Sequence, residues 1–221
     1  MAEKKVLEIV TGRQVAFEDK KILTGVFRLS YPHLFKPKAY KDGDPKFSIT
    51  MLFNKDDDLS QLEIAAHNAA VEKWGADKKQ WPSKKIKSKK TGNIISKCIV
   101  VMPFKDGETE HPDKVEYEGV TFLGASCGES KPPAVIDQNK QPLTAAGLKA
   151  GDYVRASLVA FAYPMDGKGP KVGVSFALLG VQKVKNGEAL GGGNAVNDFD
   201  EVEFDENEDS FNSEESEESE Y

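Results

Sequence analysis

The stretch Tyr153–Tyr163, YVRASLVAFAY, decides the fold class because its residues alternate between two kinds of side chain. In a β-strand, successive side chains point to opposite faces of the sheet. One face carries only small or aliphatic residues, namely Val154, Ala156, Leu158, Ala160 and Ala162. The other face carries Tyr153, Arg155, Ser157, Val159, Phe161 and Tyr163. The small apolar face suits the interior of a tightly curved β-barrel.

Other strands are predicted on both sides of this stretch. Residues 120–126 and 172–184 are β-rich, with turn-forming residues between them. Lys46–Phe53 alternates so that Phe47, Ile49, Met51 and Phe53 share one face. Lys21–Ser30 is also β-rich, and we expect it to end at Tyr31-Pro32 because proline interrupts a strand. Residues 31–44 would then form a loop.

One helix is predicted. Asp58 is the expected N-cap, with Gln61 at the reciprocal capping-box position, and Gly75 is the expected stop after Trp74. Leu62, Ala65, Ala66, Ala69 and Ala70 form an apolar stripe at helical spacing. Trp74, at the end of this stripe, is interpreted as a core residue. Several short strands and one helix, without βαβ alternation, predict a mainly β (α+β) fold, an OB-fold-like antiparallel barrel.

The charge is divided between two parts of the chain. Residues 198–221 hold 13 of the 36 acidic residues and no Lys or Arg, so residues 1–197 carry a net charge of +7. A basic body attracts polyanions by neutralising phosphates and releasing counterions. The acidic segment lacks apolar periodicity and is predicted to be a disordered tail, joined through Gly191-Gly192-Gly193. The predicted organisation is an N-terminal extension (1–20), the barrel domain (21–187), a Gly-rich linker (188–197) and the tail (198–221).

Most other protein classes are disfavoured. The apolar runs at 154–162 and 172–181 are too short and interrupted to span a bilayer, and no signal peptide is recognisable, so a cytoplasmic protein is expected. Cys98 and Cys127 are expected to be reduced thiols. The histidines, which are His33, His67 and His111, lack zinc-site spacing. No metal or other cofactor is expected.

No catalytic motif is recognisable either. Gly167–Lys171 lacks the Walker spacing, and no G-x-S-x-G elbow is present. The acidic cluster Asp56–Asp58 could suggest a two-metal nuclease, but acidic residues at a helix N-terminus explain it more simply. The chain is therefore predicted not to be an enzyme.

Aromatic and basic residues are interleaved in two segments, a pattern that suits base stacking beside phosphate contact. Residues 31–44 contain Tyr31, Phe35 and Tyr40 among three lysines, and Lys78–Lys90 has seven lysines around Trp81 without an acidic residue. The residues predicted to stack on bases are Tyr31, Tyr40, Trp81, Phe161 and Tyr163. Those predicted to contact phosphates are Arg28, Lys84, Lys85, Lys87, Lys89, Lys90 and Arg155. Two alternatives stay open. Lys78–Lys90 could be only a solvated charged segment, and Phe161 and Tyr163 could pack under a loop or at a dimer contact instead of stacking on bases.

Aromatic residues are scattered through the acidic tail, namely Phe199, Phe204, Phe211 and the terminal Tyr221. These offer apolar anchors to the pocket of a partner protein. A tail that recruits partners or regulates binding is therefore favoured over one that serves only solubility.

Several blocks of the C-terminal half resemble a tailed-phage family long classified only as a domain of unknown function. The blocks are Gly119–Ser126, Lys131–Asp137, Gln141-Pro-Leu143, Gly151–Ser157, Leu179-Gly-Val-Gln182 and Asn186–Gly191. The resemblance covers roughly residues 20–193 and is densest over 119–193. The family includes phage single-stranded-DNA-binding proteins with an OB-fold.

The resemblance implies sequence-independent binding of single-stranded DNA in phage replication, recombination or repair. It also implies an acidic tail that recruits replication or recombination proteins and competes with DNA. This tail ends in Tyr221, where such tails usually end in Phe. A strand-annealing recombination mediator and an acidic DNA mimic are the alternatives, and the sequence leaves open single-stranded RNA binding and whether the chain is a monomer or a dimer.

Overall fold

The fold was analysed in a computed structural model that describes residues 15–16, 20–41, 43–87, 92–163 and 172–190. The chain divides into two units, Met1–Gly191 and Gly192–Tyr221, and all described residues belong to the first. The predicted acidic tail, with Phe199, Phe204, Phe211 and Tyr221, lies outside the described residues. In the part of the chain that is described, no helix is long and apolar enough to cross a membrane.

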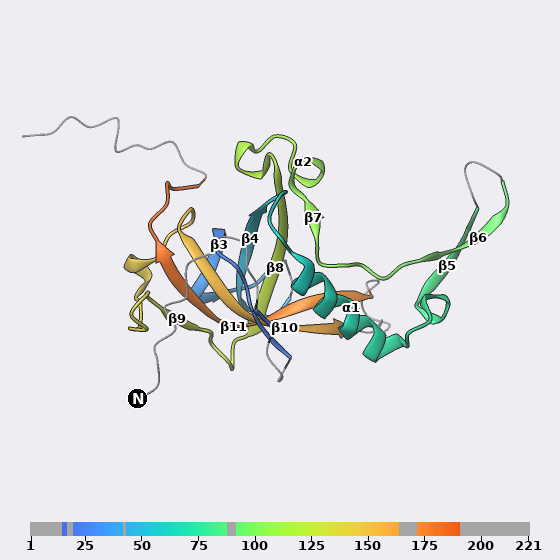
Figure 1. The fold of residues 1–221 in the computed structure, drawn as a ribbon, viewed down its shortest axis with the longest axis horizontal. Coiled ribbons are helices and arrows are strands. Elements are labelled where there is room, and N and C mark those ends of the chain that lie inside the picture. The colour runs from blue at the N-terminus through green and yellow to red at the C-terminus, as the bar shows by residue number, and fades with distance from the viewer. Residues whose placement is uncertain (1–14, 17–19, 42, 88–91, 164–171, 191–221) are drawn as a thin grey trace, which may run out of the picture. The chain divides into compact units, whose positions relative to one another are not determined.

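The described part is mainly β, with one long helix (Figure 1). The strands are β1 (Val15–Ala16), β2 (Lys21–Leu23), β3 (Phe27–Lys38), β4 (Lys46–Asn54), β5 (Ser83–Lys87), β6 (Ile94–Cys98), β7 (Lys105–Asp106), β8 (Val120–Gly128), β9 (Ala134–Ile136), β10 (Tyr153–Tyr163) and β11 (Gly173–Lys185). The helices are α1 (Ser60–Trp74) and the short α2 (Gly107–Glu110), with 3-10 turns η1 (Lys78–Gln80), η2 (Val115–Tyr117) and η3 (Ala145–Gly147).

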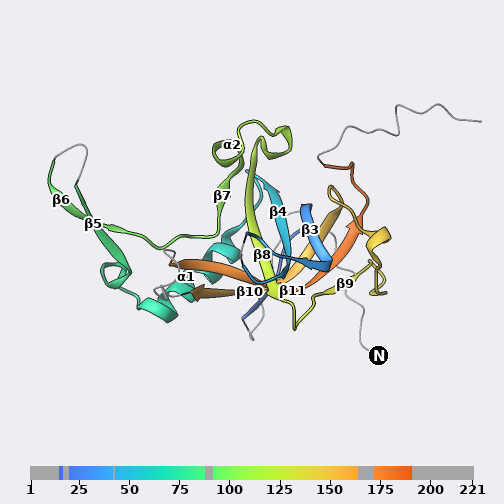
Figure 2. The same ribbon diagram turned by 180° about the vertical axis from the view of Figure 1, so that it is seen from behind.

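Five strands close into a barrel in the order β10-β3-β4-β8-β11, because β11 pairs back onto β10. Figures 1 and 2 show these strands curving around a common interior. All neighbours are antiparallel except β8 and β11, which are parallel. A closed five-stranded barrel of this kind is the OB-fold. The predicted fold class is confirmed.

The barrel interior follows the alternation read in the sequence. On β10, Val154, Ala156 and Leu158 are completely buried, and Ala160 and Ala162 pack against the same core. On β4, all four residues predicted to share a face, Phe47, Ile49, Met51 and Phe53, are buried. Burial of these side chains is the main favourable contribution to folding, at roughly 25 cal/mol for each Å² of apolar surface removed from water.

The predicted end of the first long strand is wrong. Strand β3 continues through Tyr31-Pro32 to Lys38, so most of the predicted loop is strand. The register with β4 shifts between Ser30 and His33, and Tyr31 has a positive φ of 44°. These are the features of a β-bulge, where the ladder is already interrupted and proline's missing N–H is tolerated.

Helix α1 has the predicted extent and apolar stripe. Leu62, Ala66 and Ala70 are buried, Trp74 packs against the core as predicted, and the helix ends at Gly75, with a φ of 87°. The predicted capping box is wrong because the N-cap is Leu59, without a side-chain cap. The Asp58 carboxylate instead accepts a hydrogen bond from the Ser60 backbone N–H at 2.9 Å.

A buried ion pair joins the start of β10 to the end of β11. Asp152 is completely buried, and its carboxylate lies 2.8 Å from the Lys183 ammonium. It also accepts hydrogen bonds from the backbone N–H groups of Lys149 and Gly187. Burial alone would raise the pKa of Asp152, but these three interactions outweigh it, so the pKa lies below its ordinary value.

Replacing Asp152 with asparagine leaves the Lys183 charge without its partner, and we expect the free energy of unfolding at pH 7 to fall by about 3 kcal/mol. Because folding lowers this pKa, the carboxylate stabilises the fold above its unfolded-state pKa of about 3.9. The stabilisation is lost as pH falls through the lower folded-state pKa. The difference in the free energy of unfolding between wild type and Asp152→Asn should therefore become smaller at acid pH. Urea unfolding across pH measures it, with exposed Asp44→Asn as the control; equal stability of both variants would contradict this role.

Candidate nucleic-acid interface

The outer face of β3, β4 and β8 carries a strip of small polar residues and glycine. Alternation turns the apolar residues of β4 and β8 inward and leaves these short residues outside. The small-residue strip consists of Ser48, Thr50, Gly124, Ser126 and Gly128. A Cβ added at Gly128 would meet nothing within 4 Å, so the surface above this glycine is open. A planar base or a sugar–phosphate chain could therefore approach the sheet closely.

One end of the strip is bounded by a small second core on the outside of the barrel. Leu52 of β4 and Phe122 of β8 are neighbours in the sheet, and Tyr117 of η2 covers them. The His111 ring lies 4.3 Å from the Tyr117 ring. This packing fixes the segment between β7 and β8 against the barrel wall.

The same segment brings a lysine to an exposed tyrosine. The Lys114 ammonium lies 2.5 Å from the Tyr31 hydroxyl and 5.2 Å from the centre of its ring. The hydrogen bond with Tyr31 is the main cause that raises the pKa of Lys114. The Tyr31 side chain is 49% exposed. Tyr31 lies in the β3 bulge, between Ser30, which pairs with Thr50 of β4, and His33, which pairs with Ser48. This end of the strip thus presents an aromatic face and a fixed positive charge.

The other end of the strip is also cationic and aromatic. Lys38 and Lys46 lie directly opposite each other across β3 and β4, an arrangement of like charges that an anion would stabilise. Tyr40, in the loop between these strands, is 81% exposed, and the Lys41 ammonium lies 5.5 Å from its ring centre. Burial and, secondarily, the charge of Lys38 lower the pKa of nearby His33.

Of the predicted contact residues that the structure describes, two, Tyr31 and Tyr40, lie at the strip. Arg155 is on the outer face of β10, where its Nε donates to the Gln182 side chain at 2.8 Å. Arg28 donates one N–H to the Glu188 carbonyl oxygen at 3.1 Å, so part of its guanidinium joins β3 to the chain after β11. Phosphate contacts by these two arginines stay predictions.

The remaining predicted contacts lie elsewhere. Phe161 and Tyr163 are at the far end of β10, and Phe161 is 42% exposed. Lys84, Lys85 and Lys87 are exposed on the separate two-stranded sheet of β5 and β6. Lys89 and Lys90 are outside the described residues.

Trp81 is a core residue. Its side chain is 7% exposed, its indole N–H donates to the Gly75 carbonyl oxygen at 2.8 Å, and its ring packs near those of Trp74 and His67. The ring has no free face for a base, so the prediction that Trp81 stacks on one is wrong. The lysines that flank Trp81 in the described sequence are exposed, but the Trp81 indole itself packs against the end of α1.

Sequence reasoning did not find Lys114. It stands between Asp113 and Glu116, so the local sequence has no basic character that marks it. Its partner Tyr31 is 83 positions away, and only the folded chain brings the two together.

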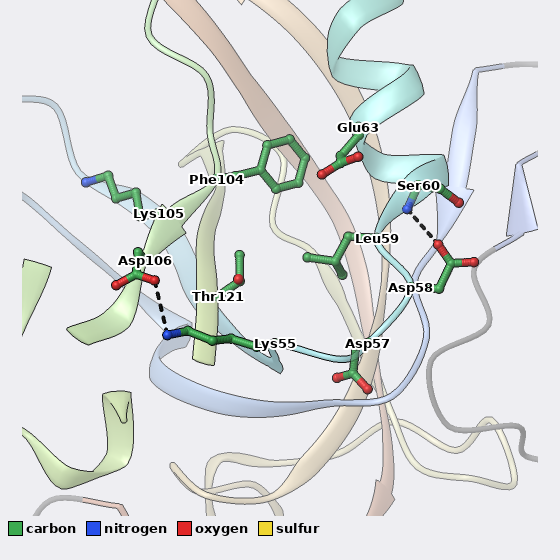
Figure 3. A pocket seen from close by; sticks show the side chains of 10 residues that line it. All are labelled: Lys55, Asp57, Asp58, Leu59, Ser60, Glu63, Phe104, Lys105, Asp106 and Thr121. Atoms are coloured by element: carbon green, nitrogen blue, oxygen red, sulfur yellow. Dashed lines mark hydrogen bonds and ion pairs between the residues drawn. The ribbon is translucent and has the colours of Figure 1, made fainter. Parts of the chain in front are cut away.

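The acidic residues near the start of α1 line a pocket of about 420 Å³ with Lys55 and Phe104 (Figure 3). Its aspartates have structural partners, which for Asp58 is the Ser60 backbone N–H. Asp57 accepts the Asn54 N–H, Asp106 accepts the Thr109 N–H, and Lys55 forms an ion pair with Asp106. Among the described residues there is no cluster of three or more His, Cys, Asp or Glu side chains arranged to hold a metal ion. These contacts assign the carboxylates to helix ends and loops.

Comparisons with known proteins agree with this geometry. The chain is 31% identical over 189 residues to protein p50 of Acyrthosiphon pisum secondary endosymbiont phage 1, covering 82% of this chain and 94% of that protein. The single-stranded DNA-binding protein from bacteriophage Enc34, solved in complex with ssDNA, superposes with a TM-score of 0.62 at 25% identity, covering 86% and 97% of the two chains. Bacteriophage T7 gp2.5, a single-stranded DNA binding protein, shares the fold, with a TM-score of 0.53 at 15% identity over 84% and 97%.

The family model of the ssDNA-binding protein of Enterobacter phage Enc34 matches residues 20–211, which include every described strand of the barrel. The match also includes both ends of the small-residue strip. The chain belongs to the Enc34-type phage ssDNA-binding protein family.

Proposed function

We propose that this protein binds single-stranded DNA, independently of base sequence, along the outer face of β3, β4 and β8. The observation that carries the proposal is the small-residue strip with an exposed tyrosine and lysines at each end. In OB-folds this face and the loop between the first two barrel strands take oligonucleotides. Those elements correspond here to the strip and to the loop that holds Tyr40.

The chemistry of the strip favours binding without sequence preference. Its hydroxyls and glycines offer no bidentate pattern of the kind that Arg, Asn or Gln uses to distinguish bases. The flanking tyrosines can stack on any base, at about 1–3 kcal/mol for each base. Lysines neutralise phosphates, which makes affinity fall with salt.

The protein then acts passively, without catalysis, by coating and protecting single strands during phage DNA replication, recombination and repair in the host cytoplasm. Phe161, Tyr163, Arg28 and Arg155 are proposed as further contacts on the barrel. The acidic tail competes with DNA for the basic surface and recruits replication or recombination proteins through Phe199, Phe204, Phe211 and Tyr221. Support for the tail's role comes from the charge division of the sequence.

Replacing Tyr31 with alanine should weaken binding of fluorescent oligo-dT by about 1–3 kcal/mol because one stacking face is lost. Fluorescence anisotropy measures this loss.

Lys114→Gln should reduce the magnitude of the slope of log affinity against log salt by about 0.7, the value for one phosphate contact on a single strand. Fluorescence anisotropy across a salt series measures this slope.

Lys185→Gln is the matched control for Lys114→Gln. Lys185 also lies over a tyrosine ring, 4.4 Å from the centre of Tyr153, but β10 and β11 place it away from the strip. The slope of log affinity against log salt for Lys185→Gln should equal that of the wild type. If Lys114→Gln and Lys185→Gln behave alike, the strip is not the binding face.

Removing residues 198–221 takes away 13 negative charges and should tighten oligo-dT binding, most strongly at low salt, where charge competition is least screened. Comparing residues 1–197 with the full chain over a salt series tests this competition. Equal affinity of the two forms at every salt concentration would limit the tail to recruiting partners.

A further inference from the structure

Strands β5 and β6 form a hairpin that pairs with no strand of the barrel sheet among the described residues (Figure 1). We call β5 and β6 the lysine hairpin. The sequence from Lys78 to Lys105 holds nine lysines and no Asp or Glu. Four of them, Lys84, Lys85, Lys87 and Lys97, are on the two strands and are exposed.

The pairing register concentrates this charge. Lys84 lies directly opposite Lys97, a like-charge pair that destabilises a sheet in the absence of an anion. Lys85 and Lys87 project from the opposite face of the same hairpin, since side chains alternate along a strand. No ion pair to these four lysines is found within the described parts of the chain. The hairpin is therefore cationic on both faces.

Apolar side chains accompany the lysines. Ile94 is 75% exposed and Ile95 is 45% exposed, and Ile95 pairs with Ile86 across the hairpin. A two-stranded hairpin is only marginally stable alone in water. Its surface therefore matches a partner that offers both negative charge and apolar area, as the phosphates and unstacked bases of a single strand do.

The base of the hairpin is held firmly to the barrel. Trp81, just before β5, is buried in the main core. After β6, the N–H of Val101 donates to the Val172 carbonyl oxygen at 2.8 Å, and the Val174 N–H donates to the Val101 carbonyl oxygen at 2.9 Å. A Cβ at Gly173 would collide with the Val101 carbonyl and with the Tyr163 hydroxyl, so glycine permits this close approach.

These contacts place the base of the hairpin at the end of β10 and the start of β11. The connection between the last two barrel strands belongs to the oligonucleotide-binding side of an OB-fold. Phe161, which is 42% exposed, and Tyr163 are at the same end of β10. A strand that leaves the barrel there meets the base of the lysine hairpin.

We propose that the lysine hairpin is a second nucleic-acid surface, which binds the phosphates of a single strand after the strand passes the end of β10 and the start of β11. The inference rests on the proposed function of the barrel face and adds a separate contact to it. The chain then holds a long strand at two surfaces and a short strand at one.

The test compares full-length wild type with Lys84→Gln/Lys85→Gln/Lys97→Gln and with the control Lys73→Gln/Lys140→Gln/Lys149→Gln. The control removes three exposed lysines from α1 and from loops outside the hairpin. Binding of dT oligonucleotides of about 8 and about 30 nucleotides, a range around the 4–16 that one OB-fold covers, is measured across salt. Circular dichroism and thermal unfolding confirm that all three proteins are folded.

For the long oligonucleotide, the hairpin variant should lose about 2 from the magnitude of the salt slope, at about 0.7 for each phosphate contact. The short oligonucleotide should bind wild type and variant equally, and the control should match wild type on both. A different result would separate the two proposals. If the wild type binds only the long oligonucleotide, and the hairpin variant loses salt slope on it, the hairpin contact is supported and the barrel face is refuted as a binding site.

Three results would overturn the inference. An unchanged slope on the long oligonucleotide means that the hairpin does not contact the strand. An equal loss on both lengths means that its lysines belong to the barrel site. Tighter binding by the hairpin variant means that the hairpin attracts a polyanion other than DNA, such as the acidic tail.

Discussion

Closure of the barrel depends on β10 having hydrogen-bonded partners along both of its edges. One edge pairs with β11 from Tyr153 to Tyr163, and the other pairs with β2 and the start of β3. The Asp152–Lys183 ion pair holds the beginning of β10 against the end of β11. Backbone hydrogen bonds join Leu29 of β3 to Gly151 and Asp152 at the same point. Three strands of the barrel are therefore tied together where β10 starts.

Closure also decides which surface is available for binding. Once the apolar residues of β4 and β8 fill the interior, their short polar residues must lie outside, since side chains alternate along a strand. Among the described residues, Tyr117 covers one part of this outer face by packing on Leu52 and Phe122. Gly124 and Gly128 of β8 are exposed, as are Tyr31 and Tyr40. The proposed binding face therefore follows from how the core is filled.

The connection between β4 and β8 holds several elements that lie outside the five barrel strands. It includes α1, which packs on β10 and β11, the lysine hairpin, and the segment that carries Lys114. The last two are anchored to the barrel by buried aromatic rings, Trp81 for the hairpin and Tyr117 for the Lys114 segment. Aromatic residues in this connection thus anchor the positions from which lysines project. Such a division suits a protein that recognises a charged chain rather than a particular base.

Local periodicity and composition were sufficient to predict several features of this protein. Alternation in Tyr153–Tyr163 and Lys46–Phe53 identified two barrel strands, the stripe from Leu62 to Ala70 identified the helix, and the charge division pointed to a polyanion. Tertiary structure alone decided the use of individual side chains. Trp81 is buried although its neighbours in sequence are lysines, and β3 passes through Pro32 because β4 pairs on both sides of the bulge. Lys114 reaches Tyr31 only through the packing of Tyr117. Burial and charge pairing depend on residues distant in sequence, and a local pattern contains no information about them.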